Sequence, residues 1–348
     1  MSFTKFDPTD LVVSSDAVTA PAWSSNLPTL TTFFTASSGI TSSFYVDVYN
    51  TASTNINAAV QFSIAYGRSD GSGSVPLNSL VPQNTPTKIN FGQYRNIIYG
   101  DNERAINFGA GNINSTDLVA IAIDRNRYKE SLFPGTFNLI LGYATAGTTL
   151  KLTDNSNDVS TISYLDCGRV YDIVSGSNGT AKNSPTITGA SGPGYTPSGS
   201  YGLFLPDIGL IVLNPRALSL PVGSTGGGLA LPFYSGSGIS ATNYTNNLLI
   251  LETIQSGSSF QLNSQETISS DYVFVRIKNG EYNYTSNPSF ITGSGDLIYS
   301  NFVYSPQTYI TTVGMYNNNN ELLAVAKLSK PLVKDFTKEA LIRVKLDW

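Results

Sequence analysis

The chain has 348 residues, of which only 13% are charged, and its formal net charge is −4 with an isoelectric point near 4.9. This length exceeds the usual size of a single hydrophobic core and predicts two domains. The acidic balance argues against a nucleic-acid binder, which would carry a basic face. The absence of histidine excludes Ser-His-Asp and Cys-His catalysis and the commonest zinc sites.

Glycine, serine, threonine, asparagine and tyrosine take the place of the missing charges. Many residues are β-branched or aromatic, which favours sheets over helices, so we expect an all-β protein built from two antiparallel β-sandwich-like domains. Charged side chains keep an exposed protein surface soluble, and this chain has few of them. Its composition therefore favours a subunit whose surface is covered by neighbouring subunits. A secreted or cell-surface β protein is the alternative.

The first 38 residues are rich in threonine, serine, proline and alanine, and they predict an extended N-terminal arm. Such an arm would lie on a neighbouring subunit, or it would be an ordinary first strand packed on its own domain. The sequence leaves both alternatives open. The aromatic residues that would anchor the arm are Phe3, Phe6, Trp23, Phe33 and Phe34.

Alternating apolar and polar residues indicate the first strands after the arm. Phe44, Val46 and Val48 would share one face of a strand over residues 44–49, and residues 60–66 repeat this period of two. These segments predict a β-sandwich-like domain over residues 39–160. Its further strands are expected at residues 87–91, 118–124, 136–141 and 148–152.

Residues 161–348 predict a second β-rich domain. Two stretches rich in glycine and serine within it, near 175–200 and 222–241, cannot bury enough apolar surface to fold alone and predict long loops. The four asparagines 317–320 predict a hairpin turn because asparagine tolerates positive φ, whereas Pro331 is expected to break the following strand. One helix is expected, at residues 243–256. Strands are expected at residues 272–278, 289–292, 309–316, 321–328 and 340–346.

Three local patterns resemble functional motifs, and each has a simpler explanation. Residues 154–158 place oxygen ligands at alternate positions, as a calcium loop does, but Val159 and Leu165 stand where that loop needs glycine and glutamate. A polar turn is favoured, and we expect no metal and no cofactor. Cys167, the one cysteine, is expected to be a small buried hydrophobe. The glycines of residues 223–228 lack the Gly-Lys-Ser/Thr of a phosphate loop.

Carboxylate chemistry and sugar binding stay open as alternatives. A glycosidase needs two Asp or Glu side chains roughly 5–10 Å apart, and the sequence cannot select a pair. Trp23, Tyr282 and Tyr284 could stack on sugars, although aromatic residues at strand spacing more often pack across strands. The N-terminus predicts no signal peptide, and no segment is long and apolar enough to predict a membrane span.

Several blocks of the sequence carry a resemblance to a known family. Residues 312–348 read TVGMYNNNNELLAVAKLSKPLVKDFTKEALIRVKLDW, and residues 274–291 read FVRIKNGEYNYTSNPSFI. The blocks RYKESLFPG (127–135), YGLFLPDIG (201–209) and FDPTD (6–10) accompany them. Together they resemble a family of virion structural proteins from contractile-tailed phages, especially marine cyanophages. Ile277-Lys278 and Gly280 depart from the Ala-Arg and Ala of the family pattern, and these changes are conservative for a packing surface.

This resemblance, which runs along essentially the whole chain, implies a structural subunit of the phage tail or baseplate and no catalytic residue. It implies contacts with other phage structural proteins and with copies of the chain, no nucleic acid and no membrane. The expected location is the virion, after synthesis in the host bacterial cytoplasm. A neck or collar protein, a capsid-decorating protein, and a fibre-associated module that binds a receptor or host surface glycan are the alternatives.

Ten residues of the C-terminal half are expected at the assembly interface. Arg276 and Arg343 alternate with apolar neighbours on strands, so each guanidinium could pair with a carboxylate of a partner. The competing explanation is that all ten stabilise the second domain internally. The ten are Phe274, Arg276, Tyr282, Tyr284, Pro288, Phe290, Lys334, Phe336, Arg343 and Trp348.

Overall fold

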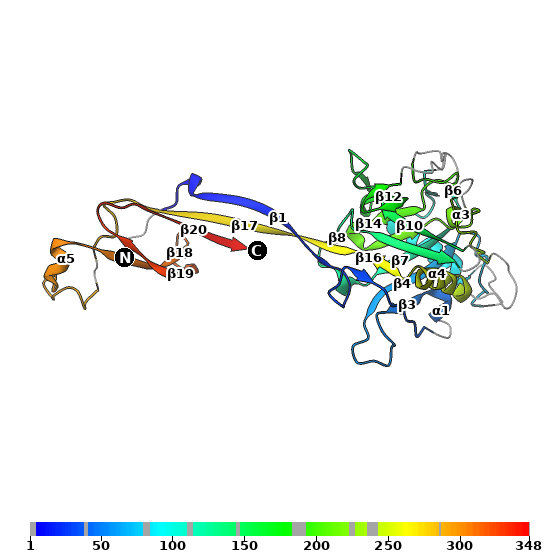
Figure 1. Cartoon of the computed structure of the whole chain (residues 1–348), viewed down its shortest axis with the longest axis horizontal. Helices are drawn as coiled ribbons and strands as arrows, with labels where there is room; N and C mark the ends of the chain where they lie inside the picture. The colour runs from blue at the N-terminus through cyan, green and yellow to red at the C-terminus, as the bar shows by residue number, and fades with distance from the viewer. Residues whose placement is uncertain are drawn as a thin grey trace. The chain divides into compact units, whose positions relative to one another are not determined.

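The computed structural model describes residues 5–37, 41–78, 84–109, 114–143, 147–182, 193–222, 227–234, 243–284 and 287–347. Strands make up 43% of the structure and helices 16%, so the expected all-β class is confirmed. The strand pairs with a described register run antiparallel. The chain divides into two compact units, and Figure 1 labels many of the elements of each. Unit 1 comprises Met1–Ala17 and Thr267–Trp348, and unit 2 comprises Val18–Glu266.

Unit 2 is built on one large, curled antiparallel sheet. Two short strands, β11 (Ser163–Leu165) and β13 (Thr180–Ala181), pair with β12 beside the main path. Strands β5 (Ile106–Asn107) and β6 (Asn114–Ser115) form a separate pair, and β8 (Ser131–Leu132) pairs with residues 264–265. The order of the main path is β2 (Thr29–Leu30), β16 (Ser259–Gln261), β9 (Asn138–Tyr143), β10 (Thr148–Asp154), β12 (Gly168–Ser177), β14 (Gly202–Leu205), β15 (Leu210–Leu213), β7 (Asp117–Ile123), β4 (Val60–Arg68) and β3 (Val46–Tyr49).

Both faces at the centre of this sheet are buried, because a helix packs on each one. On one face Ile250 and Ile254 of α4 (Asn243–Gly257) join the core that contains Phe62, Phe204 and Phe260. On the other face Phe91, Ile98 and Tyr99 of α2 (Pro86–Tyr99) pack on Leu118 and Leu203. The central strands β14 and β15 are therefore apolar at every position, as expected for strands covered on both sides.

Helix α2 differs from the sequence prediction, which placed a strand at residues 87–91. The Thr85 side chain accepts a hydrogen bond from the backbone N–H of Lys88, and Pro86 occupies the first turn. Gly100 ends the helix in the left-handed conformation at φ 62°. These capping residues outweigh the short apolar run that suggested a strand. The predicted helix at residues 243–256 is confirmed as α4.

The N-terminal residues of unit 2 pack on their own chain. Trp23 is 2% exposed, and its indole N–H donates to the carbonyls of Pro28 (3.1 Å) and Phe260 (2.9 Å). Its ring contacts Phe260 edge-on with centroids 4.8 Å apart, and Phe33 is also in the core. The part of the N-terminal segment that contains Trp23 and Phe33 therefore packs on its own domain, which is the second of the two alternatives. Phe34 is exposed, and Phe3 lies outside the described residues.

The boundary expected near residue 160 is wrong. Strands β9 and β10, which precede it, pair in the same sheet as β12 and β14, which follow it. The units instead divide within β1 (Leu11–Pro21) and within β17 (Asn263–Ile277). Much of the two predicted loops, residues 183–192, 223–226 and 235–242, lies outside the described residues.

Unit 1 has two thin layers. One is the sheet β1–β17–β20, with β20 at Ala340–Asp347, and the other is the hairpin of β18 (Thr308–Tyr316) and β19 (Leu322–Lys334). Val273 and Val344, which pair across β17 and β20, face a core that they share with Val313 and Met315 of β18. The strands predicted at 272–278, 309–316, 321–328 and 340–346 are therefore confirmed.

Two turn predictions in unit 1 have different outcomes. The asparagine turn is confirmed, because Asn317 and Glu321 close it through backbone and side-chain hydrogen bonds and Asn320 has φ 61°. Pro331 does not end its strand, because β19 continues to Lys334 past a register irregularity opposite Ile310–Thr312. Residues 289–292, predicted as a strand, form only an isolated bridge from Ile291 to Leu297.

Candidate functional site

The outer surface of unit 1 carries an unusual amount of exposed apolar side chain. Strand β1 has nearly every side chain exposed, including Leu11 and Val13. On the hairpin, Leu323 and Val325 point outward while Ala324 and Ala326 face the core. A third group surrounds α5 (Ser300–Tyr304) and comprises Phe290, Ile298, Tyr299, Val303 and Tyr304. We call these three groups together the apolar surface of unit 1.

Three of the expected interface residues share the face of the β17–β20 sheet opposite the core. Phe274 pairs directly with Arg343, and Arg276 lies two residues along the same strand. The Arg343 guanidinium lies over the Tyr272 ring, 5.4 Å from its centroid. The Arg276 guanidinium pairs with Asp10 of the same chain, with Nε and Oδ1 2.7 Å apart. Arg276 therefore already has an internal carboxylate partner.

Lys334 differs from the expectation that it contacts a partner, because its side chain is fully buried. The ammonium donates hydrogen bonds to Asn279 O (2.8 Å), Asn283 Oδ1 (2.9 Å) and Asp335 O (2.9 Å). It therefore fixes the loop after β17 to the end of β19. A buried ammonium is stable only with such a full set of acceptors.

The remaining predicted interface residues lie at several places on unit 1. Tyr282 and Tyr284 are exposed in the loop after β17, where the Tyr282 carbonyl accepts a hydrogen bond from the Thr308 hydroxyl. Pro288 is exposed, and Phe290 contacts Tyr299 with ring centroids 5.2 Å apart. Phe336 is exposed after β19, whereas Trp348 lies outside the described residues.

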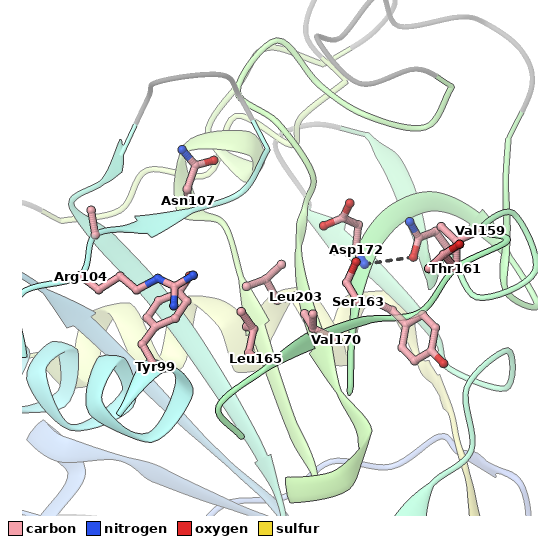
Figure 2. Close-up of a pocket in the computed structure, with 13 residues that line it drawn as sticks. Tyr99, Arg104, Asn107, Val159, Thr161, Ser163, Leu165, Val170, Asp172 and Leu203 are labelled. Carbon is pink, nitrogen blue, oxygen red and sulfur yellow. Dashed lines mark hydrogen bonds between the residues drawn. The ribbon is translucent and has the colours of Figure 1, made fainter. Parts of the chain in front are cut away.

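Sequence reasoning missed a cavity of about 320 Å³ in unit 2 (Figure 2). One wall is the segment 159–165, whose alternate residues Val159, Thr161, Ser163 and Leu165 line it and which ends in β11. Val170 of β12 and Leu203 of β14 form an apolar floor. The opposite wall comes from the end of α2, the loop after it and β5, with Tyr99, Arg104, Ala105 and Asn107. The remaining lining residues are Asn155, Tyr171 and Asp172.

Opposite charges lie at the two ends of this cavity. At one end the Arg104 guanidinium lies over the Tyr99 ring, 4.5 Å from its centroid. At the other end Asp172 Oδ2 accepts a hydrogen bond from the Tyr195 hydroxyl at 2.9 Å. Asn155 fixes both residues. Its Oδ1 accepts a hydrogen bond from the Asp172 backbone N–H, and its Nδ2 donates one to the Tyr195 hydroxyl. Burial raises the pKa of Asp172, against the opposing effect of the Tyr195 hydrogen bond.

The calcium-like segment uses its first carboxylate to organise backbone. Asp154 is fully buried and accepts hydrogen bonds from the N–H groups of Gly135 and Ser156. Across the described part of the chain no group of three or more Asp, Glu, Cys or His side chains has a metal-binding arrangement. Cys167 is half-buried, and burial raises the pKa of its thiol, which favours the unreactive protonated form.

The alternation at residues 159, 161, 163 and 165 was the available sequence signal for this cavity. The four residues are two apolar and two hydroxyl-bearing side chains at every second position, which predicts one face of a strand. Asp172 lies on β12, the strand that pairs with β11, whereas Arg104 is far away in sequence, so no local pattern could have joined both charges to this segment.

Comparison of this chain with protein-family models, curated proteins and solved structures found no match. In the described parts of the chain, none of the helices has the length and apolar character needed to cross a membrane.

Proposed function

We propose that this protein is a non-catalytic structural subunit of a contractile-tailed phage particle, in the tail or baseplate, and that it assembles through protein–protein contacts. Unit 2 serves as the rigid body of the subunit, and the apolar surface of unit 1 is the contact region. The resemblance of the sequence blocks suggests the particle, and the chemistry of unit 1 supports the mode of action.

The observation that carries the proposal is the density of exposed apolar side chains on unit 1. It contains less than a third of the chain, yet it holds well over half of the large apolar side chains that are exposed among the described residues. Single exposed apolar residues are normal on a protein surface, but groups of them mark interaction sites. Covering such side chains with a partner gains about 1.5–3 kcal/mol for each one that becomes fully buried.

Edge strands support the same conclusion. Strand β1 pairs with β17 on one side and has no described partner on its other side. Its sequence, LVVSSDAVTAP, contains no lysine, one charged residue (Asp16) and a proline only at its last position, so most of the strand lacks the features that prevent pairing with another chain. A strand from a second copy or from another structural protein could extend this sheet.

The test is incorporation into particles. We expect the Leu323→Ser, Val325→Ser double variant to fold, because both side chains are exposed, and to be lost from purified particles. The matched control is Leu27→Ser, Ile56→Ser, which changes two apolar residues of unit 2 that are also mostly exposed. Quantitative mass spectrometry measures the copies of each variant per particle. Equal incorporation of both variants would contradict the role of unit 1.

A reconstruction of the particle by electron cryomicroscopy tests the location. Density for the chain in the tail or baseplate is the expected outcome. Density in the neck, collar or capsid would agree with a structural role but would contradict the proposed location in the tail or baseplate. If purified particles lack the chain, or if the isolated protein degrades a polymer, the proposal is wrong.

A further inference from the structure

We propose that the cavity between Tyr99, Ser163 and Asp172 in unit 2 binds one neutral saccharide residue. This inference goes beyond the structural role, because that role needs no small ligand. The volume of about 320 Å³ is at the lower end of the range for small-molecule sites.

The cavity combines an apolar floor with polar walls. Figure 2 shows Leu165, Val170 and Leu203 between Tyr99 and Arg104 on one side and Asp172 on the other. A sugar ring has the same division, since its C–H groups form apolar faces and its hydroxyls project around the rim. The C–H face would lie on the apolar floor, and the hydroxyls would reach the walls. Thr161, Ser163 and Tyr171 contribute hydroxyl groups to these walls.

The charges at the two ends select a neutral ligand. A singly charged sugar would be attracted by one end and repelled by the other, so it gains little to offset the cost of removing its own charge from water. A neutral hydroxyl can satisfy both, because it donates to a carboxylate and accepts from a guanidinium, and such charge-assisted hydrogen bonds are stronger than neutral ones. Among the described residues, the hydrogen bond from Tyr195 occupies Oδ2 of Asp172, which leaves Oδ1 as the acceptor for the ligand.

The groups that would bind the sugar are held in place before it arrives. Asn155 is buried and contacts both Asp172 and Tyr195, so it fixes the carboxylate. Tyr99 is the last residue of α2 and is buried in the core, so its position follows from the helix. A preformed site avoids the entropy cost of ordering side chains when a ligand binds.

The experiment titrates the full-length protein with glucose, galactose, mannose and N-acetylglucosamine, and detects binding by saturation-transfer NMR. Glucuronic acid and glucosamine are the charged comparisons. We expect at least one neutral sugar to bind and both charged sugars to bind more weakly than it. Absence of binding for all four neutral probes, or tighter binding of a charged probe, would overturn the proposal.

Two serine variants locate the site. Ser163→Tyr places a large side chain in the cavity, whereas Ser160→Tyr changes an exposed residue of the same segment that does not line it. We expect Ser163→Tyr to weaken the sugar at least tenfold, equal to about 1.4 kcal/mol, and Ser160→Tyr to have no effect. Because both positions are exposed, neither change should unfold the protein. Equal affinity of the two variants would place any binding elsewhere and overturn the proposal.

Discussion

The two units use similar residues in opposite ways. In unit 2, helices α2 and α4 cover both faces of the sheet, and its central strands β14 and β15 bury every side chain. In unit 1, two thin layers share one small core, so half of each strand stays at the surface. Apolar side chains therefore stabilise unit 2 from within, whereas in unit 1 many of them are available to partners. The number of covering layers, and not the composition, makes this difference.

The comparison extends to buried polar groups. Unit 2 buries the carboxylates of Asp117 and Asp154 in networks with Tyr66, Gly135 and Ser156. In unit 1 the most deeply buried charged side chain is Lys334, which is fully enclosed by carbonyl and amide oxygens. Each unit thus has its own polar element on which the packing around it depends.

The largest expected effect comes from the core of unit 2. Trp23→Ala should destabilise the protein by about 3–5 kcal/mol, because it leaves a cavity and removes the hydrogen bonds to Pro28 and Phe260. Tyr304→Ala removes a large side chain that is 88% exposed in unit 1 and should cost less than about 0.5 kcal/mol. Urea unfolding followed by circular dichroism measures both. Similar decreases in the free energy of unfolding for the two variants would contradict the difference between the two units.

Lys334→Met tests the polar element of unit 1. The substitution keeps the length of the side chain and removes one donor from each of three oxygen acceptors, which should cost about 1–3 kcal/mol. Lys327→Met is the matched control, because Lys327 is exposed on the same strand. Amide hydrogen exchange of β18 and β19 reports the stability of this unit directly. If the amides of β18 and β19 exchange at the same rate in both variants, Lys334 has no structural role.

A pair of glycine variants tests the contact between α4 and β9 in unit 2. An added Cβ at Gly257 would lie 1.8 Å from the carbonyl oxygen of Ile140, so Gly257→Ala should cost about 1–3 kcal/mol. At Gly92 in α2 an added Cβ meets nothing within 4 Å, so Gly92→Ala should stabilise the helix by up to about 1 kcal/mol. Thermal unfolding should move in opposite directions for the two variants. If Gly257→Ala does not lower the unfolding temperature, α4 and β9 can separate to make room for the added methyl group.

The smallest effect is a change in pH dependence. Burial raises the pKa of Asp172 above its usual 3.8, so the folded state binds this proton more tightly than the unfolded state. The stability from Asp172 is therefore fully present below its unfolded pKa and is lost as pH rises through the folded value. Asp172→Asn removes this titration. The free energy of unfolding of the natural protein, minus that of the variant, should fall with rising pH in the acidic range, as measured in urea. A flat difference would contradict the burial of this carboxylate.

Local patterns predicted most of unit 1 because its strands are half-exposed and alternate clearly. On β19, for example, Ala324 and Ala326 face the core, whereas Leu323 and Val325 face outward. In unit 2, strands covered on both faces lose the alternation, and α2 was missed because its capping residues Thr85 and Gly100 were not weighed against a short apolar run. The predicted interface was only partly brought together, because Lys334 proved to be internal.

By itself the sequence determined the all-β class, the asparagine turn at residues 317–320, the helix at 243–256 and the exclusion of histidine chemistry. These depend on residue type and on neighbours close along the chain. Only the tertiary structure decided the division into units, the burial of Lys334 and the meeting of Arg104 with Asp172 in one cavity. Such features arise when distant segments pack together, because burial and electrostatics depend on distances in space that no local pattern contains.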